Sequence, residues 1–146
     1  MIDKNFDTIY KTFRIELYRR IFAVIGQRDG ALSAIDFFSV ETIYLLGNPT
    51  ITEFANTLCI SQPNATYRIK SLIEKGYVVK SETEKKNTFR LQVTEKFMRF
   101  WHEDMDYGHF IFKRLAERFT PEELEQVDGI FEEFIKQIKM EEQQTC

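Results

Sequence analysis

The chain has 146 residues, the length of one domain, and 43% of them are hydrophobic, which is enough for a folded core. No apolar run approaches the ~20 residues of a membrane helix, and the amino terminus lacks the apolar core of a signal peptide. Two cysteines cannot form the disulfide framework of a small secreted protein, so we expect a cytoplasmic protein with no membrane partner. The net charge of −3 argues against non-specific nucleic-acid binding.

The first third of the sequence predicts two helices. From Phe6 to Ile25 apolar residues recur at steps of three and four, which is typical of a long amphipathic helix. The glycines in segment 26–30 indicate a loop. Ser33 is a candidate N-cap for an apolar helix over 34–46.

The centre of the chain, residues 51–93, has the pattern of a helix, a tight turn, a second helix and a hairpin. Thr50 and Ser61 are candidate N-caps of two short helices. Gly76 lies where the second helix needs a residue that tolerates positive φ. The two strands of the hairpin are expected at 77–80 and 88–93.

One face of the second of these helices carries hydrogen-bonding side chains in place of apolar ones. An α-helix fits the major groove of DNA, and its N-terminus suits a phosphate. Residues 61–90 hold seven basic and three acidic side chains, a net charge of +4, which leaves −7 for the rest of the chain. A basic patch on an acidic body favours one DNA-docking face.

The residues expected at this face divide by the chemistry of their side chains. Base edges are assigned to Asn64, Thr66, Tyr67 and Lys70. Phosphates are assigned mainly to Ser61, Gln62, Arg68, Lys85, Lys86 and Arg90, with Asn87 beside them in the tip of the hairpin.

After the hairpin the sequence predicts two more long helices. Thr94 is expected to cap a helix that continues to about Phe119. The sequence Thr-Pro-Glu-Glu at 120–123 is typical of a helix start and opens the last helix. These helices and the first one carry more apolar surface than the small central module covers, so we expect a partner chain.

Several short segments follow one another in an order and spacing that are typical of one family of proteins. They are Ile-Thr-Glu-Phe-Ala at 51–55, Ile60-Ser61, Ala65-Thr66, Leu72, Glu-Lys-Gly-Tyr-Val at 74–78 and Thr-Glu-Lys at 94–96. Together they resemble the MarR family of bacterial winged-helix regulators, and the resemblance covers essentially the whole chain. It implies a mainly α fold with a small β-hairpin wing: a winged helix-turn-helix with long N- and C-terminal dimerisation helices.

The resemblance also implies how the chain is divided. It implies one MarR-type domain over 1–146, with dimerisation helices at 1–32 and 120–146, the winged helix-turn-helix at 33–93 and a long connecting helix at 94–119. The implied assembly is a homodimer with recognition helices about one DNA turn apart.

The chain departs from the family at two places. Family members often carry Asp-x-Arg at the wing tip, where this chain has Lys85 and Asn87. The recognition helix often has Arg where this chain has Tyr67. Lys85 and Lys86 are expected to bind phosphate, and the minor-groove contact of the family arginine is not carried over.

The function implied by the resemblance is a sequence-specific transcriptional regulator that binds double-stranded DNA. It would be a ligand-responsive repressor acting as a homodimer on a pseudo-palindromic operator. The alternatives are a winged-helix module for protein interaction and a small-molecule-binding protein without operator binding. The sequence has no Gly-rich phosphate loop, nucleophile elbow or paired metal motif, so we expect neither an enzyme nor a cofactor.

Fourteen phenylalanines allow either an effector pocket or simply an aromatic core. Relatives bind phenolic or other lipophilic anions between the dimer helices and the DNA module, which implies a small lipophilic or anionic effector. The residues of the candidate pocket are Phe13, Tyr18, Phe37, Phe38, Phe100, Trp101 and Tyr107.

Two further patterns are open to a chemical and a structural interpretation. His102, Asp106 and His109 have a helical spacing that can hold zinc, but the chain has no other histidine, and a polar helix face is favoured over a metal site. Cys59 precedes the recognition helix, where a thiol can be a redox switch or simply pack as a small apolar residue. Packing is favoured.

Overall fold

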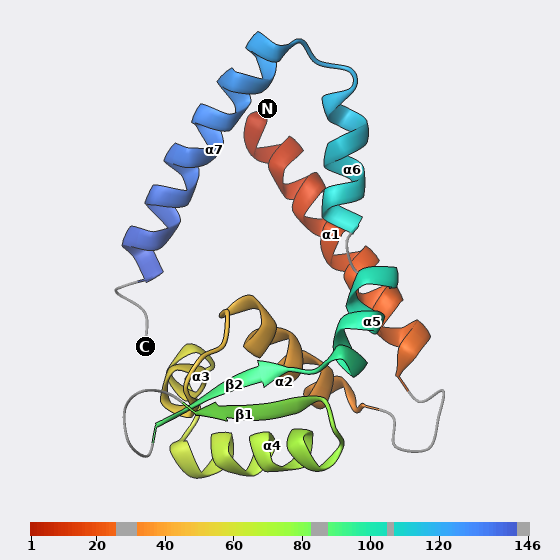
Figure 1. The fold of residues 1–146 in the computed structure, drawn as a ribbon. Helices are drawn as coiled ribbons and strands as arrows, with labels where there is room; N and C mark the ends of the chain where they lie inside the picture. The colour runs from red at the N-terminus through yellow and green to blue at the C-terminus, as the bar shows by residue number, and fades with distance from the viewer. Residues whose placement is uncertain (26–31, 83–87, 105–106, 143–146) are drawn as a thin grey trace. The chain divides into compact units, whose positions relative to one another are not determined.

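The structure, a computed structural model, describes residues 1–25, 32–82, 88–104 and 107–142 (Figure 1). Its internal contacts divide the chain into two units, Met1–Asp106 and Tyr107–Cys146. The elements are α1 (Ile2–Val24), α2 (Ala34–Leu45), α3 (Ile51–Thr57), α4 (Gln62–Glu74), β1 (Val78–Glu82), β2 (Phe89–Val93), α5 (Glu95–Asp104), α6 (Tyr107–Ala116) and α7 (Pro121–Glu142). No helix among the described residues combines the length and the hydropathy that a membrane crossing needs.

The helices of the central module begin at the residues that the sequence predicts. The hydroxyl groups of Ser33 and Thr50 accept the backbone N–H of the third helical residue, each over 3.1 Å. In return, Asp36 and Glu53 accept the backbone N–H of the capping residue, which completes a capping box at each start. Ser61 caps α4 by a longer contact of 3.4 Å. These three N-caps are confirmed.

The end of α4 is also confirmed. Gly76 has φ of 78°, and its N–H donates to the carbonyl oxygen of Ile73 over 2.9 Å. The N–H of Tyr77 donates to the carbonyl oxygen of Leu72 over 3.0 Å. These two bonds form a Schellman motif, which reverses the chain directly into β1.

The hairpin is an antiparallel pair that runs from Val78 opposite Val93 to Glu82 opposite Phe89. Figure 1 shows it alongside α4, with its far end next to α3. The segment before α3 adds to its edge, since Thr50 forms a bridge with Arg90 and the N–H of Leu91 donates to the carbonyl oxygen of Pro49 over 2.8 Å.

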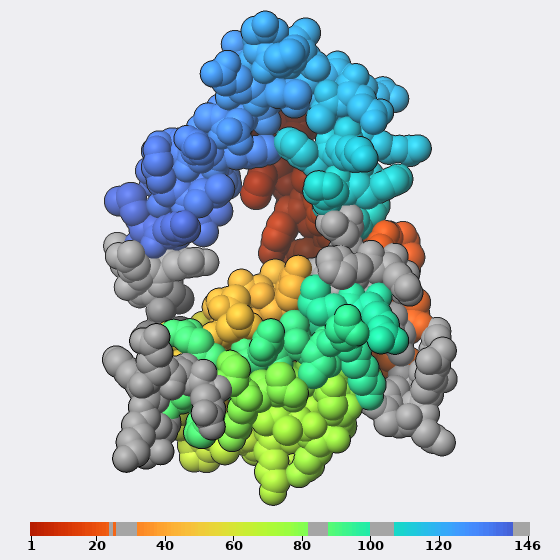
Figure 2. All heavy atoms as spheres, viewed as in Figure 1, coloured from red at the N-terminus to blue at the C-terminus, as the bar shows by residue number. Residues whose placement is uncertain are grey.

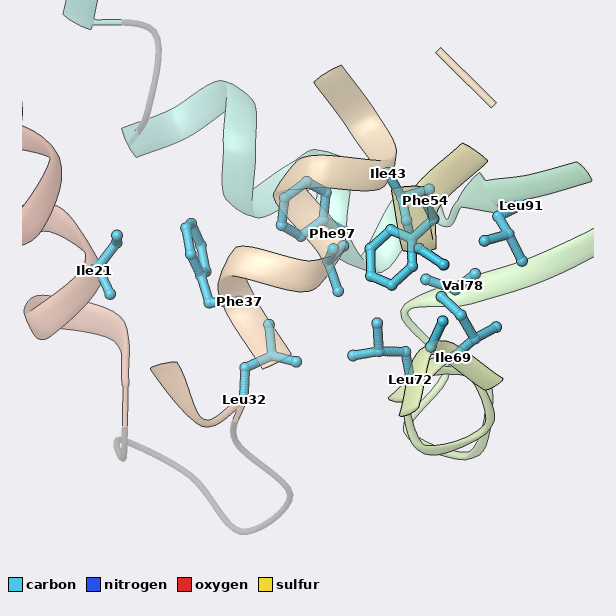
Figure 3. Close-up of a cluster of buried hydrophobic side chains, with 13 residues drawn as sticks. Ile21, Leu32, Phe37, Ile43, Phe54, Ile69, Leu72, Val78, Leu91 and Phe97 are labelled. Atoms are coloured by element: carbon cyan, nitrogen blue, oxygen red, sulfur yellow. The ribbon is translucent and has the colours of Figure 1, made fainter. Parts of the chain in front are cut away.

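The core of the first unit joins every element of the central module (Figure 3). Phe37 of α2 is fully buried, and its ring centre lies 6.0 Å from that of Phe97 at the start of α5. Ile21 brings the end of α1 into the same cluster. The other fully or almost fully buried apolar side chains are Val40, Ile43, Phe54, Ala55, Ala65, Ile69, Leu72, Val78 and Leu91.

The long terminal helices are present, with differences in their bounds. The first helix begins at Ile2, four residues before its predicted start, because nothing in the preceding sequence breaks it. The single helix predicted over 94–119 corresponds to α5 and α6, and the junction at 105–106 lies outside the described residues, so its continuity stays a prediction. The last helix starts as predicted, with Thr120 and Glu123 in a reciprocal cap.

An ion pair ties the end of α4 to the start of α2. The ammonium of Lys75 lies 2.5 Å from Oδ2 of Asp36, and the two side chains are 35% and 15% exposed. Partial burial of Asp36 opposes ionisation, but hydrogen bonds from Lys75 and Ser33 outweigh it and hold the pKa of the carboxyl below its ordinary value of 3.8.

We expect Asp36→Asn to lower the free energy of unfolding at pH 7 by about 1 kcal/mol, because asparagine can still accept the N–H of Ser33 but leaves Lys75 without its charge partner. The folded-state pKa is depressed, so this stability exists above the unfolded-state value and disappears as pH falls through the folded value. Urea unfolding should therefore show the gap between wild type and variant closing below about pH 4.

Asp7→Asn is a matched control for this measurement, because it breaks the exposed Lys11–Asp7 pair of α1, where both side chains are more than half exposed. It should change the free energy of unfolding by less than about 0.5 kcal/mol. A gap for Asp36→Asn that stays constant down to strongly acidic pH would contradict the assignment.

Candidate nucleic-acid interface

Helix α4 has one buried side and one exposed side. Ala65, Ile69 and Leu72 are buried in the core. Figure 2 shows the atoms of α4, in yellow-green, at the surface of the first unit. The exposed side carries the predicted contact residues Ser61, Gln62, Asn64, Thr66, Tyr67 and Lys70, and Arg68 is half-buried at its flank.

Several of these side chains are already oriented by neighbours within the module. Nε2 of Gln62 donates to the hydroxyl of Thr52 in α3 over 3.1 Å. The hydroxyl of Thr66 donates to the carbonyl oxygen of Gln62 over 2.9 Å. The ammonium of Lys70 lies 4.0 Å from Glu74, one turn further along the helix. Tyr67 is 76% exposed, an unusual exposure for an aromatic residue on a small module.

The turn between α3 and α4 is built around a residue of uncommon backbone conformation. Cys59 has φ of 49°, and the N–H groups of Cys59 and Ile60 donate to the carbonyl oxygens of Asn56 and Ala55. This is a Schellman ending with cysteine where glycine is usual, at a cost of roughly 1–2 kcal/mol. The Cys59 side chain is exposed, so the interpretation that it packs as a small apolar residue is wrong.

The wing contributes one predicted contact residue that can be placed. Lys85, Lys86 and Asn87 lie outside the described residues, and their contacts with DNA stay predictions. Arg90 is on β2, and its Nη1 donates to the carbonyl oxygen of Asn48 over 2.9 Å. The same nitrogen lies 3.5 Å from Oε2 of Glu53. Its guanidinium is therefore engaged with the start of α3.

Lys80 is a further basic residue of the wing, and it is not among the predicted DNA contacts. Its ammonium lies 5.5 Å from the ring centre of Phe89, and both residues are exposed. The two-residue alternation of the strands places Lys80 and Phe89 on the same face as the buried Val78 and Leu91. That alternation is readable in the sequence, and it puts a cation on the inner face of the wing.

The structure places only part of the candidate effector pocket. Phe37 is fully buried against Phe97 and Phe38, so this member fills the core. Phe13, Tyr18 and Phe38 are exposed, Tyr107 belongs to the other unit, and the side chains of Phe100 and Trp101 lie outside the description. A pocket between dimer helices and DNA module stays a prediction.

Two charged groups lie near these aromatic residues. Nη2 of Arg14 donates to the hydroxyl of Tyr18 over 3.1 Å, and this bond raises the pKa of the guanidinium further. Glu41 lies one turn after Phe37 on α2, and desolvation by burial raises the pKa of its carboxyl.

The metal candidate is only partly covered by the structure. His109 is on α6, whereas Asp106 and the side chain of His102 lie outside the described residues. Across the residues that are described, no group of three or more His, Cys, Asp or Glu side chains is placed to hold a metal ion.

Comparison with known proteins gives a match to one family model over part of the chain and a fold shared with solved structures. A sequence model of the MarR family matches residues 32–85, from the start of α2 into the wing. No curated protein matches the sequence of this chain.

Three solved structures illustrate the shared fold. A MarR-like transcriptional regulator from Thermotoga maritima is 21% identical, with 90% of this chain and 95% of that chain covered and a TM-score of 0.57. The adhesin competence repressor from Streptococcus pyogenes is 22% identical, with coverage of 94% and 98% and a TM-score of 0.55. FabT from Streptococcus pneumoniae, solved in complex with DNA, is 15% identical, with coverage of 94% and 95% and a TM-score of 0.62. At these identities the likeness shows the fold alone.

Proposed function

We propose that the chain binds double-stranded DNA as a sequence-specific transcriptional regulator, and the match of residues 32–85 to a model of the MarR family supports this. The observation that carries the proposal is the two-sided α4. Its apolar side is fixed in the core, so its polar and basic side must face solvent. A rod with hydrogen-bonding side chains on its outer face fits a major groove.

In this proposal the exposed residues take separate roles. Asn64, Thr66, Tyr67 and Lys70 meet base edges, and the start of α4 meets a phosphate through its free N–H groups. Gln62, which its hydrogen bond to Thr52 holds in place, contacts the DNA backbone. Lys85 and Lys86 meet phosphates beside the groove.

We further propose that the protein is a homodimeric repressor in the cytoplasm that responds to a small lipophilic or anionic effector. The exposed apolar side chains of its terminal helices support the dimer. In α1, Phe6 and Ile9 are about half exposed, and in α7 the same holds for Phe131 and Phe134. Large apolar side chains left exposed along a helix favour an interaction surface. Two copies would place two recognition helices on a pseudo-palindromic operator.

The proposal is tested by titrating the purified protein against its own upstream DNA and against random DNA at two salt concentrations. Site-selective binding that weakens with salt is the expected result. Weak binding that is equal on both DNAs would contradict it and favour a module for protein interaction or a small-molecule-binding protein.

Lys85→Ala should weaken binding to operator and random DNA alike, because a phosphate contact carries no sequence information. The slope of log affinity against log salt should become shallower by about 1. Lys136→Ala on α7 removes the same charge from an exposed side chain, and it should leave the slope unchanged. Equal slopes for wild type and Lys85→Ala would remove Lys85 from the interface.

Asn64→Ala and Tyr67→Ala should change sequence preference, because their side chains are assigned to base edges. Each lost base contact should cost roughly 1–3 kcal/mol on the operator and little on random DNA. Selection of binding sites from random DNA by each variant measures this directly. Losses of the same size on both DNAs would assign these residues to the backbone.

The dimer is tested by measuring mass in solution over a range of concentrations. We expect twice the chain mass of 17.4 kDa at working concentrations. Replacing Phe131 and Phe134 by serine should shift the equilibrium toward the monomer, since it removes apolar surface from the proposed interface. A monomer mass at every concentration would exclude the proposed assembly.

A further inference from the structure

We propose that Arg90 is a positioning residue that holds the wing against the helix-turn-helix, and that it acts on DNA affinity without contacting a phosphate itself. This inference rests on the proposed function, because it concerns how two DNA-binding elements are held together. It replaces the phosphate role that the sequence suggests for Arg90.

The contacts of Arg90 all lead to one short segment. Its Nη1 donates to the carbonyl oxygen of Asn48 over 2.9 Å and lies 3.5 Å from Oε2 of Glu53. That same carboxylate oxygen accepts the N–H of Thr50 over 2.7 Å in the capping box of α3. Arg90 is therefore attached to the group that starts the first helix of the helix-turn-helix.

The backbone beside Arg90 makes a second attachment to the same segment. The N–H of Leu91 donates to the carbonyl oxygen of Pro49 over 2.8 Å, and Thr50 forms a bridge with Arg90. Leu91 is fully buried, which anchors the inner face of β2. The side chain of Arg90 points to the opposite face of the strand. Arg90 through its side chain and Leu91 through its backbone N–H therefore both attach β2 to the segment around the start of α3.

The turn before α3 is shaped for this contact. Gly47 and Asn48 have φ of 66° and 64°, so two consecutive residues adopt the left-handed conformation. For an asparagine this conformation is tolerated but less favourable than the right-handed one. Arg90 gives the carbonyl oxygen at this turn a charged donor, and charge-assisted hydrogen bonds are the stronger kind.

The position of Arg90 explains why this attachment would matter for DNA. Arg90 follows the wing tip by three residues, and α3 packs directly on the recognition helix α4. The Arg90 contacts thus join the strand that leads out of the tip to the pair of helices that presents α4. Loosening them would let the wing and α4 vary in relative orientation, which costs affinity when both must contact one duplex.

The charge of Arg90 is partly used within the protein. Glu53 compensates it at close range, and the exposed fractions of 47% and 56% mean that the pair adds little to folding stability. A variant at either position should therefore remain folded. The guanidinium of Arg90 should also displace few counterions on DNA binding, unlike a lysine that neutralises a phosphate.

The experiment compares Arg90→Gln, Glu53→Gln and the double variant with wild type. The probes are a duplex carrying the site that wild type selects from random DNA and a random duplex of equal length. Glutamine at residue 53 preserves the capping box, because Glu and Gln both serve at that position. Arg99→Gln and Glu95→Gln are the matched controls, because they remove the same charges from an exposed pair on α5.

We expect Arg90→Gln to lower affinity for the selected site about tenfold with an unchanged salt slope. Glu53→Gln should lower it in the same direction, and the double variant should lose no more than Arg90→Gln alone, because both act through one contact. Arg90→Lys should keep most of the wild-type affinity, because in wild type a single nitrogen, Nη1, makes the contacts with both Asn48 and Glu53. Hydrogen exchange of segment 88–93 in the free protein should rise in Arg90→Gln.

A salt slope that becomes shallower by about 1 in Arg90→Gln, with higher affinity in Glu53→Gln, would overturn the inference and make Arg90 a phosphate contact. Unchanged affinity in both variants, or losses equal to those of the α5 controls, would also overturn it. Failure of wild type to select any site from random DNA would instead reject the proposed function. The two failures are therefore distinguishable.

Discussion

Burial of Ala65, Ile69 and Leu72 on one side of α4 is the constraint on which the rest of the structure depends. These residues meet Phe54 of α3 and Val78 of the hairpin in one core, so the angle and rotation of α4 are set by packing. Once the helix cannot rotate, the residues between the buried positions must face solvent. The exposed polar face of α4 is thus a consequence of how its other face packs in the core.

The parts of this arrangement that local chemistry determines were predictable from sequence. The starts of α2, α3 and α4 follow from Ser33, Thr50 and Ser61, since each hydroxyl can satisfy a free N–H within three residues. The end of α4 follows from Gly76 for a similar reason. The two faces of α4 follow from its apolar period. Each of these features depends on residues only a few positions apart.

The features that escaped prediction depend on residues far apart in sequence or on backbone geometry without a compositional sign. The pairing of Arg90 with Asn48 and Glu53 spans about forty positions, and no periodicity points to it. Cys59 takes a left-handed conformation at a position where glycine would have been the signal. Phe37 looks the same in sequence whether it lines a pocket or fills the core, and only its burial decides.

Charge shows most clearly why sequence proximity can mislead. The net charge of +4 over residues 61–90 omits Asp36 and Glu53, which lie outside that segment but beside Lys75 and Arg90 in space. Including these two acids lowers the local excess to +2. Two of the seven basic side chains, Lys75 and Arg90, are thus paired within the module, and in the proposed function the attraction for DNA falls to the others. Those others include Arg68 and Lys70 of α4, Lys80 of the wing, and Lys85 and Lys86 of its tip. The salt dependence of binding should report mainly this smaller set, because an internally paired cation releases few counterions when DNA arrives.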